Sequence, residues 1–127
     1  MFKLLGAEKL IVGIDISDSY TQISYCTLEN EEQIETLSMT AGVEKFNIPT
    51  LLCKKPKSNQ WFIGKDALKC ADEENGILIR DLLKLTMQGE IVELEGADVE
   101  AEILFHTFLK KCAHRTNIGL YLVKNII

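Results

Sequence analysis

The residues with the clearest chemical potential are an acidic side chain and a small polar turn that adjoin each other early in the chain. Asp15 stands near the end of an apolar run, residues 10–16, and Ser17, Asp18 and Ser19 follow. Short polar side chains favour a tight turn, because they hydrogen-bond their own backbone. A carboxylate at the rim of such a turn suits the binding of a phosphate and its metal ion.

Three strands are predicted to carry this turn. Residues 10–16 are mostly apolar and β-branched, which indicates a strand covered on both faces. Residues 20–28 alternate between apolar and polar side chains, and residues 33–39 do so again. The simplest arrangement is an antiparallel meander with the turn at 17–19 at one end.

The middle of the chain predicts shorter elements. Residues 48–53 form an extended run with Pro49 at its start or on an edge, and residues 60–64 return as its partner strand. Asp66 is expected to cap a short helix. The leucine spacing in 77–85 favours a helix over a strand, and residues 91–94 form a short strand.

The most regular helix is predicted over 98–115. Asp98 is a suitable N-cap, and cationic residues follow at the other end, where they favour the helix dipole. The apolar stripe of this helix consists of Ala101, Leu104, Phe105, Phe108, Leu109 and Cys112. His106 lies on the same helix and is interpreted as a structural histidine without an acidic partner at helical spacing.

Composition restricts the class of protein. A chain of 127 residues suits one domain, and its net charge of -5 argues against nucleic-acid or anionic-membrane partners. No apolar run approaches the roughly 20 residues of a membrane helix. The four cysteines form no Cys-x-x-Cys pair, which indicates buried thiols in a reducing compartment and a cytoplasmic protein. Lys54, Lys55 and Lys57 are expected to form a solvated basic loop.

Two stretches resemble one ATPase superfamily. Residues 12–21 are similar to the first phosphate loop of the actin, sugar-kinase and heat-shock ATPases, whose usual form is apolar-Gly-apolar-Asp-apolar-Gly-Thr-Thr-x-Ser. Residues 48–52, followed by 62–67, resemble the Pro-Ser strand and Gly-x-x-Ala passage of heat-shock chaperones and bacterial actins. The order and spacing of both stretches match.

The resemblance implies a mixed α/β fold with a ribonuclease H-like sheet and an incomplete first lobe. Residues 9–39 would form the meander with the phosphate loop, 40–97 a small inserted subdomain, and 98–127 a helix and the start of the next strand. ATP and Mg²⁺ would bind between this lobe and a second one. Asp15 would act on the magnesium shell through water, and Ser17, Asp18, Ser19 and Tyr20 would face the phosphates.

Two departures from the motif leave the function open. Ser17 and Asp18 replace the glycine and first threonine of the usual loop. One hypothesis is the N-terminal part of a heat-shock-like ATPase, inactive as an enzyme by itself. The alternative is a pseudo-ATPase scaffold or protein-interaction module, and a sugar or acetate kinase is a minor third reading.

The expected partners follow from these hypotheses. The remaining lobe of the same protein would complete the site, and a protein client or partner would receive its conformational change. The chain ends on Ile126 and Ile127 within an apolar run, so we expect a piece of a longer protein. An unpaired sheet edge, or the segment 120–127, would then promote self-association.

Overall fold

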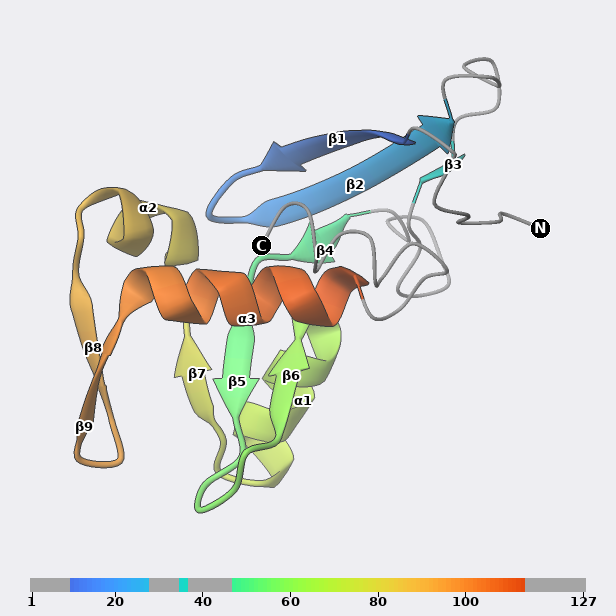
Figure 1. The fold of residues 1–127 in the computed structure, drawn as a ribbon. Coiled ribbons are helices and arrows are strands. Elements are labelled where there is room, and N and C mark those ends of the chain that lie inside the picture. Colours follow the sequence, from blue (N-terminus) through green and yellow to red (C-terminus); the bar gives the residue numbers. More distant parts are fainter. Residues whose placement is uncertain (1–9, 28–34, 37–46, 114–127) are drawn as a thin grey trace.

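The computed structural model describes residues 10–27, 35–36 and 47–113, which form a mixed α/β structure with antiparallel sheets (Figure 1). The elements follow in the order β1 (Leu10–Ile16), β2 (Tyr20–Thr27), β3 (Glu35–Thr36), β4 (Ile48–Pro49), β5 (Leu52–Lys54), β6 (Trp61–Ile63), α1 (Gly64–Glu73), β7 (Ile77–Ile79), α2 (Leu82–Met87), β8 (Ile91–Leu94), β9 (Ala97–Glu100) and α3 (Ala101–Ala113).

The predicted hairpin is present. β1 and β2 pair antiparallel, with Ile16 opposite Thr21 and Ile14 opposite Ile23. β3 and β4 both pair with β2, so β2 is the central strand of this sheet in the described part of the chain. Only positions 35 and 36 of the predicted third strand, 33–39, fall within the described residues. Ile14 is 37% exposed, so the prediction that both faces of residues 10–16 are covered is wrong at this position.

A second sheet, in the strand order β6-β5-β7, has α3 on one face and α1 on the other (Figure 1). Successive side chains of its short strands point to opposite faces of the sheet. β5 lies between β6 and β7, and Leu52 is opposite both Ile63 and Ile79. These three side chains join the cluster that includes Phe108 of α3. The next position, Cys53, belongs to the opposite face and packs with residues of α1. The sheet is therefore buried on both sides despite its small size.

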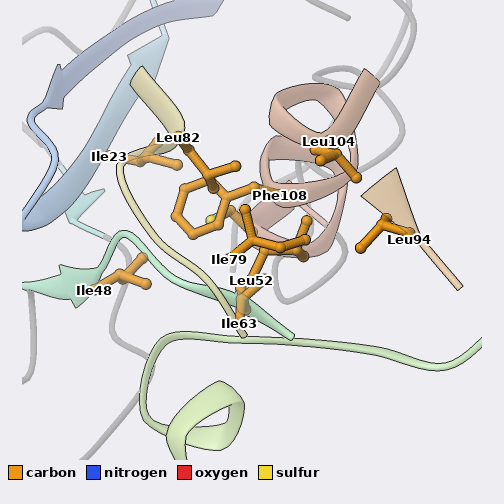
Figure 2. Packing of buried hydrophobic residues seen from close by; sticks show 10 residues of the cluster. Ile23, Ile48, Leu52, Ile63, Ile79, Leu82, Leu94, Leu104 and Phe108 are labelled. Atoms are coloured by element: carbon orange, nitrogen blue, oxygen red, sulfur yellow. The ribbon is translucent and has the colours of Figure 1, made fainter. Parts of the chain in front are cut away.

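The larger core connects this sheet to the hairpin through α3 (Figure 2). Phe108 is fully buried and lies amid side chains of β5, β7 and α2. Of the predicted helix stripe, Ala101, Leu104, Phe108 and Cys112 are buried, whereas Phe105 and Leu109 are half-buried. Burying a large side chain of this kind stabilises the fold by about 2–3 kcal/mol. The hydrophobic stripe therefore predicted the packing face of α3 correctly.

Two predictions for the middle of the chain are wrong. Residues 48–53 do not form one strand, because β4 pairs with the hairpin while β5 joins the second sheet. Residues 77–85 do not form one helix. Ile77–Ile79 pairs with β5 as a strand, and α2 begins only at Leu82, after Asp81 turns the chain with φ of 58°.

Both predicted helix caps are wrong. α1 begins at Gly64, so Asp66 lies inside its first turn, where its charge still favours the helix dipole. Asp98 lies in β9, opposite Glu93 of β8, and α3 begins three residues later. Asp98 is not a cap because β8 and β9 form a hairpin that was not predicted from the sequence. Glu95 and Gly96, the two residues of its turn, both have positive φ, as a type I′ turn requires.

In the part of the chain that the structure describes, no helix is both long enough and apolar enough to cross a membrane.

Candidate functional site

The turn between β1 and β2 is organised by the hydroxyl of Ser17. The backbone N–H of Ser17 donates to the carbonyl oxygen of Tyr20 at 2.9 Å, and its hydroxyl donates to the same oxygen at 3.2 Å. Ser17 Oγ also accepts hydrogen bonds from the N–H groups of Ser19, at 3.3 Å, and Tyr20, at 3.1 Å. One serine side chain therefore engages two of the amides that a phosphate loop would direct at its ligand.

Asp15 lies where the sequence predicts, at the rim of the hairpin. Its side chain is exposed, and its cross-strand partner is Gln22. Ser17 and Ser19 are exposed as well, so the carboxylate and the turn share an accessible end of the hairpin. Across the described residues, no group of three or more His, Cys, Asp or Glu side chains is placed to hold a metal ion. A cation at Asp15 would need most of its ligands from water or from another molecule.

Asp18 has a structural partner far away in the sequence. Its Oδ1 accepts a hydrogen bond from the backbone N–H of Lys84 at 3.2 Å. Lys84 lies in the first turn of α2, where the N–H groups have no partner within the helix. The residue that precedes α2, Asp81, makes no capping hydrogen bond with its side chain. The hairpin thus supplies the cap that the local sequence of α2 does not.

The underside of the turn is fixed by β4. The N–H of Thr50 donates to the carbonyl oxygen of Ser19 at 3.1 Å, and Tyr20 pairs with Pro49. The hydroxyls of Thr21 and Thr50 hydrogen-bond each other at 2.7 Å, and both side chains are fully buried. Sequence reasoning placed Thr21 in a strand but did not foresee this contact. The turn is therefore held by β4 below and by α2 beside it.

The fit of this turn to a nucleotide phosphate is poor. A phosphate that approached the Ser19 and Tyr20 amides would displace Ser17 Oγ, with the loss of two hydrogen bonds worth about 1 kcal/mol each. Asp18 also adds a negative charge to this turn, and a like charge disfavours the approach of a phosphate. The geometry is that of a turn whose donors are used within the protein.

The other residues considered from the sequence have structural contacts. His106 is half-buried, and its Nε2 lies 4.0 Å from Glu102 Oε1, so the prediction that it lacks an acidic partner is wrong. Lys54 forms an ion pair with Glu95, whose other carboxylate oxygen accepts the N–H of Lys57 at 2.9 Å. These contacts lower the pKa of the Glu95 carboxyl from its usual 4.5. The hydrogen bond from Lys54 contributes most, followed by the one from the Lys57 backbone. The basic loop is thus tied to the β8–β9 turn.

Comparison with known proteins gives a family without an assigned activity. A family model described as "Family of unknown function (DUF5716) C-terminal" matches residues 33–121, well over half of the chain. The matched region starts after β2, so the hairpin and its turn lie outside it. A search of curated proteins finds no match to the chain.

Proposed function

We propose that this chain, which belongs to the Family of unknown function (DUF5716) C-terminal, serves as a protein-interaction scaffold built on an actin-type, heat-shock-like lobe that does not bind nucleotide productively. The order of its elements supports the proposed relation to the actin-type and heat-shock ATPases. A hairpin is followed by a strand at Ile48–Pro49, a strand that ends before Gly64, the helix α1 and the amphipathic helix α3.

One observation carries the proposal: the turn that should receive phosphate is committed to the protein's own structure. Ser17 Oγ occupies the Ser19 and Tyr20 amides, and Asp18 caps α2. In the ATPases that the sequence resembles, a glycine at the position of Ser17 would let the backbone approach the phosphate closely. Here both substituted side chains hold the turn in place, so the same hairpin acts as a joint between the two sheets and α2.

The cytoplasm is the compartment that we propose for this scaffold. The thiols of Cys53 and Cys70 are buried and form no disulfide in the described part of the chain. Free thiols persist where glutathione and thioredoxin keep cysteines reduced. The partners of the scaffold would be the remaining lobe of the same protein and a protein client.

A second candidate function is nucleotide binding in the complete protein, with Mg²⁺ as the cofactor. The exposed carboxylate of Asp15 beside the exposed Ser17 and Ser19 favours it, because this is the placement that a water-mediated magnesium contact needs. This chain would then supply one wall of a two-lobed site and would not turn over ATP without the other wall.

Calorimetric titration of the full-length protein with Mg·ATP distinguishes the two candidates. We expect no saturable binding tighter than about 1 mM, which corresponds to a binding free energy of about -4 kcal/mol. The double variant Ser17→Gly, Asp18→Thr restores the usual loop residues, and a gain of binding in it alone would identify these two side chains as the cause. Saturable wild-type binding that Asp15→Ala abolishes would reject the scaffold in favour of nucleotide binding.

A further inference from the structure

Two buried cysteines face each other between α1 and the second sheet. Cys53 lies on the central strand β5, and Cys70 lies on the inner face of α1. Both belong to the small cluster that also contains Leu51 and Ala67, and their side chains are 0% and 4% exposed. Neither thiol takes part in the hairpin site described above.

Gly76 shows how close the two sulfur atoms are. A Cβ at Gly76 would lie 2.3 Å from Cys53 Sγ and 2.7 Å from Cys70 Sγ, so the two sulfur atoms lie no further apart than the 5.0 Å sum of these distances. Both side chains belong to the same buried cluster. A disulfide bond is about 2.05 Å long, so rotation of one or both cysteine side chains must close the remaining gap. From this juxtaposition we propose that Cys53 and Cys70 form a redox-sensitive dithiol, which closes to a disulfide by exchange with a low-molecular-weight disulfide such as oxidised glutathione.

The reagent would enter at Cys70. A surface pocket of about 330 Å³ reaches this residue, and its lining consists of Phe62, Asp66, Lys69, Cys70, Glu73 and Glu74. Cys53 does not line the pocket and is fully buried behind Cys70. The pocket lining carries one lysine and three acidic side chains, so an amino group and a carboxylate of the reagent can each find an opposite charge there. Cys70 Sγ also donates a hydrogen bond to Glu74 Oε2, at 3.9 Å, which directs the thiol toward the pocket side of α1.

The exchange proceeds in two balanced steps. Cys70 loses its proton to solvent, and its thiolate attacks one sulfur of the reagent disulfide. That disulfide bond breaks, a mixed disulfide forms on Cys70, and one glutathione thiolate leaves and is protonated. The Cys53 thiol then loses its proton, and its thiolate attacks Cys70 Sγ and displaces the second glutathione. Two protein thiols are oxidised by two electrons, and one reagent disulfide is reduced to two thiols.

The two cysteines have different roles because their environments differ. Burial raises the pKa of the Cys53 thiol to about 12, with further contributions from Cys70 and from the Glu74 carboxylate. Such a thiol is rarely ionised, so it reacts poorly with a reagent in solution. Next to a mixed disulfide on Cys70 it gains the high effective concentration of an intramolecular reaction. The product joins α1 covalently to the central strand of the sheet.

The test is oxidation of the folded full-length protein by oxidised glutathione, followed by intact mass spectrometry and peptide mapping. We expect the wild type to lose two hydrogen atoms and to yield a linked peptide pair that contains Cys53 and Cys70. A thiol reductant should reverse both changes. The cross-linked form should melt several degrees higher than the reduced form, since the bond constrains the unfolded chain.

Single variants separate the two roles. Cys53→Ser should retain one glutathionyl group on Cys70, because the resolving thiol is absent, whereas Cys70→Ser should leave Cys53 unmodified. Cys112→Ser is the matched control, since it removes another fully buried thiol and should form the same cross-link as the wild type.

Three outcomes would overturn the proposal. In the first, the folded wild type keeps both thiols under conditions that fully oxidise its urea-unfolded form. In the second, the cross-link joins other cysteines. In the third, Cys53 of the Cys70→Ser variant is glutathionylated as fast as the wild type forms its cross-link. Because the first of these compares folded and unfolded wild type, the result does not depend on whether a variant folds.

Discussion

Replacement of Asp18 by alanine tests whether the hairpin turn serves structure. The variant removes the acceptor of the Lys84 N–H and leaves the first turn of α2 without a side-chain cap, since Asp81 provides none. Loss of a helix cap costs about 1 kcal/mol, and the favourable interaction of a carboxylate with the helix N-terminus is worth about 0.3–1 kcal/mol more. We therefore expect the free energy of unfolding to fall by about 1–2 kcal/mol.

The assay is urea unfolding followed by circular dichroism, combined with amide hydrogen exchange. A loss of this size should lower the urea midpoint by about 0.5–1 M. Exchange should accelerate most in α2, because its six residues depend on the distant cap. Asp18→Asn keeps an oxygen acceptor and removes the charge, so it should lose only about 0.3–1 kcal/mol.

Asp15→Ala is the matched control. It removes an equal charge from the same hairpin, but its side chain is exposed and the Lys84 N–H donates to Asp18 instead, so the urea midpoint should not change. The reasoning would be refuted if Asp18→Ala were as stable as the wild type, or if the two alanine variants lost stability equally.

Three other perturbations test the packing and the buried polar groups. Gly76→Ala should lower the free energy of unfolding by about 1–3 kcal/mol in chemical denaturation, since its Cβ would meet two sulfur atoms at 2.3 and 2.7 Å. Gly13→Ala, whose Cβ meets nothing within 4 Å, should show no such loss, and equal stability of the two variants would contradict the close packing around Gly76. Thr21→Val and Thr50→Val should each cost about 1–3 kcal/mol by leaving a buried hydroxyl unpaired, whereas the double variant should lose less than the sum in a double-mutant cycle. Finally, burial raises the pKa of the Cys53 thiol to about 12 in the folded state, against 9.0 for an unperturbed thiol. Between about pH 9 and pH 12, the unfolded state therefore loses this proton while the folded state keeps it. Stability should then fall by about 1.4 kcal/mol per pH unit above pH 9, and urea titrations of Cys53→Ser should lack this slope.

Elements whose signals are local could be predicted from the amino-acid sequence. The apolar run of residues 10–16, the alternation of residues 20–28 and the turn chemistry of Ser17 specify the β1–β2 hairpin, because all three act between residues that are close in the chain. The same holds for the apolar stripe of α3, which predicted its buried face. Asp15 could be placed at the rim of the hairpin for the same reason.

The pairing of these elements and the meeting of their side chains depend instead on contacts between residues that are far apart in the chain. Residues 77–79 are a strand because β5 offers a free edge, and Asp98 is a strand residue because a hairpin turn at Glu95 and Gly96 precedes it. The Asp18 contact with α2 spans 66 positions in the sequence, and the meeting of Cys53 with Cys70 depends on α1 packing against the sheet. Such contacts carry no periodic signal in the sequence. Their energy comes from neighbours that the fold brings together, and this determines whether the hairpin turn presents its donors to a ligand or uses them internally.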